Sequence, residues 1–229
     1  MKFPSLIFLL LFSVTSSRTI AGNSNVVHVA LVFDDGPFPE HAPKLLKLFA
    51  AEKIHVSFSL MASNVQSHPD LAKAILAGGH EINNHSYSHR HAKDLDDATL
   101  EYEIVGAQKI ITDATGLAPK WYWPPFLESD DRIRAMAHKA GLEVYSLKRV
   151  VVSQDYDRSV NAEEIKSKAT TNVQDDSVIL FHEWRDETYQ QMPAILAELR
   201  RQGCVFLTFS ELAALPAHNA NNQPVKQTQ

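Results

Sequence analysis

The chain has 229 residues, of which 45% are hydrophobic and 21% charged, so it can bury one substantial core and is expected to form one main domain. Its formal net charge of -5 and its scattered lysines and arginines leave no basic surface for nucleic acid, and no nucleic-acid partner is expected. The single cysteine, Cys204, excludes an internal disulfide, and it lies in an apolar run typical of a core strand.

The first residues have the pattern of an export signal. Lys2 provides a short positive start, residues 6–12 are uniformly apolar, and Thr19-Ile20-Ala21 is a small-x-small cleavage site. The apolar stretch is well short of the ~20 residues that span a bilayer. We therefore expect a signal peptide over 1–21, an exported product (periplasmic, cell-wall or secreted) and no stable membrane span after cleavage.

The mature chain is expected to hold one catalytic domain over 22–215, followed by a polar and disordered tail over 216–229. Within the domain, short β-type runs alternate with helix-type runs, which indicates parallel βα units. The predicted strands are Val26–Phe33, His55–Leu60, His80–Ile82, Trp121–Trp123, Glu143–Ser146, Ser177–Phe181 and Cys204–Thr208.

Cap and stop residues mark four of the intervening helices. One is expected to be capped by Ser67 and to stop at Gly78, with a proline in its first turn. Three more are expected over Thr99–Thr115, from Ser129 to Gly141, and over Asp186–Gln202. About seven parallel strands in this length predict an α/β fold, namely a distorted or incomplete (β/α) barrel.

The candidate catalytic groups follow the predicted strands. Asp34 and Asp35 come after the first strand, His85 and His89 after the third, and His182 directly after an apolar run. In (β/α) barrels such groups meet at the carboxyl-terminal rim of the strands. Asp35, His85 and His89 supply one carboxylate and two imidazoles, a set that suits Zn²⁺, with Co²⁺ or Mn²⁺ possible.

A metal held by three protein groups keeps a coordination position open, where it acidifies a water and polarises a carbonyl. Asp34 is a spare carboxylate beside that position, and it is placed to take the proton of the water. Each motif also has a structural reading: Asp-Asp-Gly is an ordinary turn sequence, and His-x-x-x-His can be two exposed histidines on one helical turn. Their joint occurrence with a third histidine at a strand end favours the metal site.

Five motifs together resemble those of the polysaccharide deacetylase family, in order and approximate spacing. They are Phe33-Asp34-Asp35-Gly36-Pro37, His85-Ser86-Tyr87-Ser88-His89, Trp123-Pro124-Pro125-Phe126, Ser153-Gln154-Asp155-Tyr156 and Leu180-Phe181-His182. That family includes chitin, chitooligosaccharide and peptidoglycan deacetylases and acetylxylan esterases, and it is built on a distorted (β/α) barrel. The likeness runs over residues 26–212.

The resemblance implies roles for individual residues. The three metal ligands keep the assignment given above, and Asp34 would be the general base. His182 would be the general acid that protonates the departing amine, with Asp155 orienting it and favouring its charged form.

The resemblance also implies a substrate site built around the later motifs. Pro125 and Phe126 would bind the substrate, and the backbone N–H of Phe126 would donate to the oxyanion. Tyr156 and Leu180 would line an apolar pocket for the acetyl methyl group. Trp123 shares strand parity with Trp121, and its side chain would be an apolar wall or a sugar-stacking platform if it points inward, or simply a large barrel residue.

Four positions depart from the family pattern. Trp123 stands where relatives usually have an arginine that braces the base, and Tyr156 where they have tryptophan. Leu127 replaces a usual glycine, and Val32 a usual threonine or serine. Without the arginine, three explanations compete: another cation such as Arg149 or Arg185 replaces it, the base works less well, or turnover is lost.

The resulting expectation is a metal-dependent hydrolase that removes N-acetyl groups from N-acetylglucosamine units of an acetylated glycan. An O-acetyl esterase acting on xylan would use the same groups, and a catalytically silent glycan-binding protein is the rival of a different class. The sequence does not indicate the oligomeric state, the particular glycan or the native metal.

Overall fold

A computed structural model describes residues 26–216 of the chain. The expected signal peptide lies outside the described residues, and so does the expected tail from residue 217 onward. Between residues 26 and 216, no helix is both long and apolar enough to cross a membrane.

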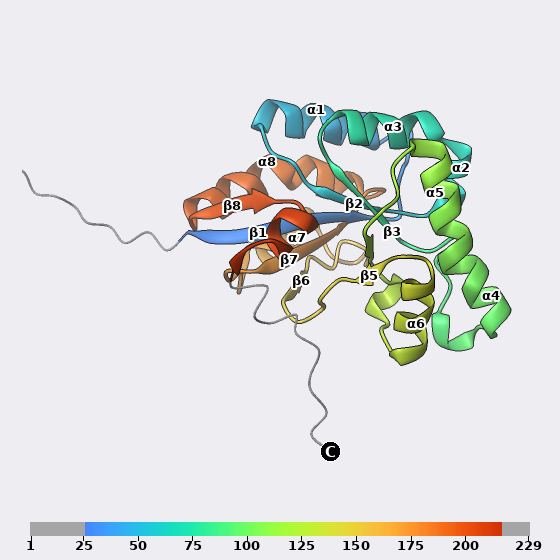
Figure 1. Ribbon diagram of the computed structural model, residues 1–229. Helices are drawn as coiled ribbons and strands as arrows, with labels where there is room; N and C mark the ends of the chain where they lie inside the picture. The colour runs from blue at the N-terminus through green and yellow to red at the C-terminus, as the bar shows by residue number, and fades with distance from the viewer. Residues whose placement is uncertain (1–25, 217–229) are drawn as a thin grey trace, which may run out of the picture.

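The centre of the molecule is a curled parallel sheet (Figure 1). Its strand order is β5-β4-β3-β2-β1-β7-β6, and β8 pairs with β1 off this path. The strands are β1 (Val27–Asp34), β2 (Ser57–Leu60), β3 (Glu81–Asn84), β4 (Trp121–Tyr122), β5 (Glu143–Val144), β6 (Val150–Val152), β7 (Ser177–His182) and β8 (Cys204–Leu207). This arrangement confirms the predicted incomplete (β/α) barrel.

Helices connect most successive strands, although none lies between β5 and β6, and α1, α3 and α8 are grouped along one side of the sheet in Figure 1. They are α1 (Ala42–Glu52), α2 (Ala62–Ser67), α3 (Pro69–Ala77), α4 (Asp97–Glu101), α5 (Ala107–Thr115), α6 (Asp131–Lys139), α7 (Ala162–Thr170), α8 (Asp186–Arg201) and α9 (Phe209–Ala213). Between α4 and α5 the helix passes through a π-helical turn, Tyr102–Gly106.

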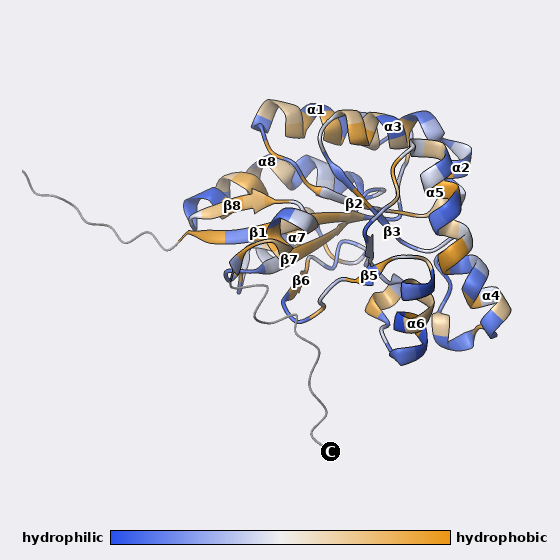
Figure 2. Cartoon of the chain, viewed as in Figure 1, coloured by the Kyte–Doolittle hydropathy of each residue, from blue (hydrophilic) through white to orange (hydrophobic). Residues whose placement is uncertain are grey.

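Alternation along β1 divides the core into two clusters. Leu31 and Phe33 point outward to the cluster under the helices, while Ala30 and Val32 point to the inner cluster. Figure 2 shows the hydrophobic colour concentrated along these central strands. This is the period of two expected of a strand buried on both faces. Trp123 belongs to the inner cluster with Trp121, so the tryptophans that share strand parity both face inward.

Three helix starts differ from the sequence prediction. Ser67 is the last residue of α2, and its hydroxyl donates to the Ser63 carbonyl, so it does not cap α3. The cap before α4 is Asp96, and the cap before α6 is Asp130. In both cases the aspartate side chain accepts a free backbone N–H of the first helical turn. The predicted starts at Thr99 and Ser129 were therefore wrong by one to three residues.

Candidate active site

The polar groups singled out in the sequence do meet at the carboxyl-terminal rim of the sheet. Asp34 is the last residue of β1 and lies in register with His182, the last residue of β7. His85 follows directly after β3, and Trp123 directly after β4. Asp155 comes two residues after Ser153, which follows β6. Because the strands are parallel, their ends gather groups that are far apart in the sequence.

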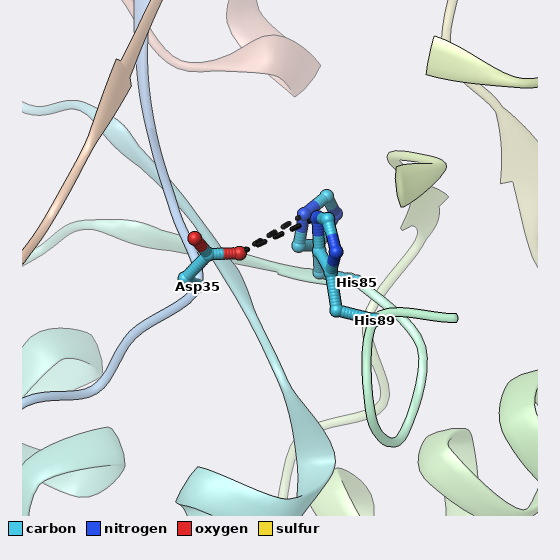
Figure 3. A group of neighbouring side chains, drawn as sticks. All are labelled: Asp35, His85 and His89. Carbon is cyan, nitrogen blue, oxygen red and sulfur yellow. Dashed lines mark ion pairs between the residues drawn. The ribbon is translucent and has the colours of Figure 1, made fainter. Parts of the chain in front are cut away.

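Asp35, His85 and His89 form a cluster whose ligand atoms all lie within 4.8 Å of one another (Figure 3). The Oδ1 atom of Asp35 is 3.6 Å from His85 Nε2 and 3.5 Å from His89 Nε2. Asp35 Oδ1 and His85 Nε2 are buried without a hydrogen-bond partner, an arrangement that is costly unless a further group satisfies them. One carboxylate and two imidazoles converging on unsatisfied atoms fit a zinc-like divalent ion.

His85 is held in the ring orientation that a metal ligand needs. Its Nδ1 lies 2.6 Å from the Trp123 carbonyl oxygen, so Nδ1 carries the proton and Nε2 is free to bind a metal. Burial lowers the pKa of His85 to about 4, and this keeps its imidazole neutral.

The segment between the two histidines is a loop, although the same spacing fits one turn of a helix. Ser86 and His89 have positive φ values of 64° and 57°, which turn the chain back on itself. Glu103, from the π-helical turn, accepts the backbone N–H groups of Tyr87 at 3.0 Å and Ser88 at 2.8 Å. This buried carboxylate therefore holds the loop that presents both imidazoles.

Asp35 is also fixed from several sides. Its Oδ2 accepts the indole N–H of Trp184 at 2.8 Å, which leaves Oδ1 toward the histidines, and its carbonyl accepts the side-chain amide of Asn64 at 2.7 Å. The next residue, Gly36, packs against buried Glu183: a Cβ there would lie 1.9 Å from Glu183 Oε2. A side chain at position 36 would therefore have to displace the Glu183 carboxylate.

Asp34 is almost fully buried and points toward the same cluster. Its Oδ2 accepts the indole N–H of Trp123 at 2.9 Å and lies 3.7 Å from His85 Nε2, while its Oδ1 has no hydrogen-bond partner. Burial raises the pKa of Asp34 well above its ordinary value, and the charge of His182 opposes that shift. An unsatisfied carboxylate oxygen beside a metal position is the feature expected of a general base.

Within residues 26–216, no arginine donates a hydrogen bond to the Asp34 carboxylate, where the resemblance implies one. Arg149 donates to the carbonyl of Asp175, and Arg185 donates to the carbonyl of Val160 at 3.0 Å. The Asp34 side chain instead accepts a hydrogen bond from the neutral indole of Trp123.

His182, which is partly exposed to the cleft, pairs with the buried Asp155 on the other side of the site. Asp155 Oδ1 lies 2.7 Å from His182 Nδ1, and Asp155 Oδ2 accepts the His182 backbone N–H and the hydroxyl of Thr188. Burial alone would lower the pKa of His182, but the hydrogen bond and charge of Asp155 raise it to about 9. The imidazole is therefore protonated at neutral pH and presents Nε2 as a proton donor.

An Asp155→Asn substitution is expected to move the pKa of His182 from about 9 to a clearly lower value, because the imidazolium loses its carboxylate partner. If His182 acts as an acid, activity falls as pH rises through its pKa, so the alkaline limb of the rate profile should shift to lower pH. The titration of the ring is measured by NMR in the metal-free protein. Asp175→Asn, which removes the carboxylate paired with His28, is the control and should leave His182 unmoved. An unchanged His182 pKa in the first variant contradicts the role of Asp155.

A cleft of about 530 Å³ opens beside these groups. Its lining residues are Asp34, Asp35, His89, Pro124, Phe126, Leu127, Val152, Tyr156, Leu180, His182 and Trp184. Leu180 and Tyr156 thus lie where an apolar pocket is expected. Trp123 and Pro125, which the resemblance places in the substrate site, are buried and do not line the cleft. Trp123 is completely buried, so the structure does not support a sugar-stacking surface at this residue.

The loop after β4 reaches the cleft through two strained residues. Phe126 and Leu127 have φ values of 55° and 56°, in the left-handed region where a side chain is disfavoured. Leu127 is the position at which the resemblance led us to expect glycine, and here the leucine adopts the glycine-like conformation and lines the cleft. The half-exposed Phe126 ring stacks on His91 at a centroid distance of 3.5 Å.

The sequence model of the polysaccharide deacetylase family matches residues 21–145. The chain belongs to the polysaccharide deacetylase family. A peptidoglycan-N-acetylglucosamine deacetylase of Bacillus cereus is 30% identical over 187 residues, which cover 80% of this chain and 87% of that protein. These comparisons confirm the predicted enzyme class, a polysaccharide deacetylase and hence a hydrolase.

Solved structures of polysaccharide deacetylase relatives have the same fold. A family 4 carbohydrate esterase from Streptomyces lividans in complex with acetate superposes with a TM-score of 0.72 at 28% identity, covering 79% of this chain and 91% of that one. The peptidoglycan deacetylase PdaC from Bacillus subtilis superposes with a TM-score of 0.77 at 26% identity, covering 86% and 95%.

Three residues of this polysaccharide deacetylase site were not identified from the sequence. Trp184 binds the carboxylate of Asp35, Glu103 holds the histidine loop, and Thr188 binds Asp155. Trp184 has a sequence signal, since a tryptophan two residues after a strand-ending histidine must lie near the rim. Glu103 and Thr188 look like ordinary polar helix residues, and only the three-dimensional packing reveals their contacts.

Proposed function

We propose that the protein removes the N-acetyl group from N-acetylglucosamine units of a glycan and releases acetate, with a divalent metal held by Asp35, His85 and His89. The observation that carries the proposal is the arrangement of two further groups at this site. Asp34 and His182 occupy paired positions at the ends of β1 and β7, and both line the same cleft as two of the candidate metal ligands, Asp35 and His89.

The donor set suits zinc, with cobalt or manganese as alternatives. When bound, such an ion supplies Lewis acidity toward the acetyl carbonyl and toward the attacking water. The chain holds the three ligands in place before binding, because Trp184, the Trp123 carbonyl and Glu103 fix Asp35, His85 and the histidine loop.

The remaining residues divide the proton transfers between them. Asp34 accepts a proton from water through its free Oδ1 as the new C–O bond forms at the acetamide carbon. His182, charged through its contact with Asp155, gives a proton to the amide nitrogen as the C–N bond breaks. Acetate and a free glucosamine amine are the products.

The cleft offers matching contacts for an acetyl group. The backbone N–H of Phe126, in the loop after β4, is the donor assigned to the oxyanion. Leu180 and Tyr156 present apolar surface for the methyl group, and the exposed rings of Phe126 and Tyr156 provide faces for sugar rings at the rim.

We also propose that the protein acts outside the cytoplasm. The amino-terminal pattern of Lys2, an apolar stretch and a small-x-small site supports export. The Bacillus cereus relative is named for peptidoglycan, a polymer of the cell wall, which agrees with that location. The division into 1–21, 22–215 and 216–229 remains a prediction.

The test is acetate release by the purified protein from chitooligosaccharides, peptidoglycan fragments and acetylxylan. We expect release from the N-acetylglucosamine substrates, loss of activity after chelation, and recovery with added zinc, cobalt or manganese. Release from acetylxylan alone would identify an O-acetyl esterase. A metallated protein without acetate release from any substrate would favour the glycan-binding alternative, and equal rates with and without metal would contradict the assigned centre.

A further inference from the structure

Trp123 contacts both a candidate metal ligand, His85, and the neighbouring carboxylate, Asp34. Its backbone N–H donates to the Asn84 carbonyl at 3.0 Å, and its own carbonyl oxygen lies 2.6 Å from Nδ1 of His85. Its indole N–H donates to Asp34 Oδ2 at 2.9 Å. One residue thus holds a metal ligand through its backbone and the neighbouring carboxylate through its side chain.

The direction of the indole N–H is set by packing. The Trp123 side chain has no exposed surface, and its ring lies 5.2 Å from Phe209 and 6.3 Å from Tyr145 between ring centroids. A buried aromatic ring surrounded in this way has little freedom to change rotamer. The donor therefore stays aimed at Asp34 whether or not a substrate is present.

The contact leaves the two carboxylate oxygens of Asp34 in different states. Oδ2 carries the indole hydrogen bond, while Oδ1 is buried and has no partner. An indole is also neutral, so it orients the carboxylate without placing a full positive charge beside it. Arg149 and Arg185, the two arginines considered as replacements for the missing one, donate instead to the carbonyl groups of Asp175 and Val160.

We propose that Trp123 is a positioning residue, whose indole N–H holds Asp34 by Oδ2 and turns Oδ1 toward the reacting water. The inference rests on the proposed function, because it assigns Asp34 as the base. It predicts that loss of the indole N–H lowers kcat and leaves the metal site intact, since the backbone carbonyl of Trp123 still binds His85.

The test compares Trp123→Phe with Trp121→Phe. Trp121 lies in the same inner cluster and donates its indole N–H to Ser210 Oγ at 2.9 Å, so its substitution removes similar atoms and one similar hydrogen bond away from Asp34. Trp123→Phe is expected to lower kcat by about 10- to 100-fold, the effect of losing a hydrogen bond to a charged group, with KM and zinc affinity unchanged. Trp121→Phe should retain most of the wild-type kcat.

A second variant separates the N–H from the bulk of the ring. Benzothienylalanine at position 123 keeps the bicyclic shape and replaces the N–H by sulfur, so it should fold like the wild type and still show the loss in kcat. Equal rates for this variant and the wild type would overturn the inference. So would a Trp123→Phe defect that appears in KM or zinc affinity and not in kcat.

A spectroscopic readout tests the contact without turnover. The indole N–H resonances are assigned by the two phenylalanine variants, and Asp34→Ala is then introduced into the metal-free protein. The Trp123 resonance is expected to shift strongly and the Trp121 resonance to stay in place. An unmoved Trp123 resonance would overturn the inference, whether or not the protein releases acetate. If the wild type released no acetate, the proposed function would fail instead, and the positioning of Asp34 would be judged by this resonance.

Discussion

An Asp34→Asn protein is expected to bind zinc as tightly as the wild type and to release acetate about 10²- to 10⁴-fold more slowly. The amide has nearly the same shape as the carboxylate, and its oxygen can still accept the indole N–H of Trp123. It cannot accept a proton at neutral pH, so the transfer from water is lost. The measurement is kcat from acetate release, with zinc affinity obtained by calorimetry.

Asp70→Asn is the matched control for that experiment. Asp70 is an exposed carboxylate on α3 that pairs with Lys73 on the surface, and its neutralisation should leave kcat unchanged. An Asp34→Asn protein that keeps most of its deacetylase rate would show that another group is the base. A protein that loses zinc as well would show that Asp34 is a metal ligand.

Replacing His89 by alanine is expected to remove both metal binding and activity. His89 supplies one of the three ligand atoms, and its Nε2 lies 3.5 Å from Asp35 Oδ1. Loss of an outer-shell partner alone weakens metal binding by about 10- to 100-fold, so loss of a ligand should exceed that range. Zinc binding and acetate release are both measured, because the two should fall together.

His28→Ala serves as the control for the ligand substitution. His28 lies at the start of β1 and pairs with Asp175, away from the strand ends that carry the site. The His28→Ala substitution should leave zinc affinity unchanged. A His89→Ala protein with full zinc affinity would exclude His89 from the metal site and would require a different ligand set.

The positions of the main catalytic candidates could be predicted because they follow strands. Asp34 and His182 each end a hydrophobic run, and parallel strands bring such ends to one rim. The strand β6 could not be predicted in the same way. Its three valines form too short a run to be distinguished from a loop, and it is recognised only by its pairing with β7.

The contacts that orient these groups were beyond the sequence. Trp123 stands where the resemblance implies an arginine, so the sequence showed that this arginine is missing. That the indole N–H of Trp123 binds Asp34 instead depends on the rotamer and packing of the ring, which the sequence does not indicate. The contact of Glu103 with the histidine loop could not be predicted either. The sequence predicts a regular helix over Thr99–Thr115, and the π-helical turn changes which side chains face that loop. Side-chain direction at such places is set by tertiary structure.

The π-helical turn between α4 and α5 also limits how this protein can be engineered. A designer seeking thermal stability would delete one residue from Tyr102–Gly106 to restore uniform helical geometry. When the deleted residue lies between Glu103 and α5, the turn closes from i→i+5 to i→i+4 geometry, and Glu103 moves from the position in which its carboxylate accepts the backbone N–H groups of Tyr87 and Ser88. A straighter helix would thus be gained at the expense of the scaffold that spaces the two imidazoles.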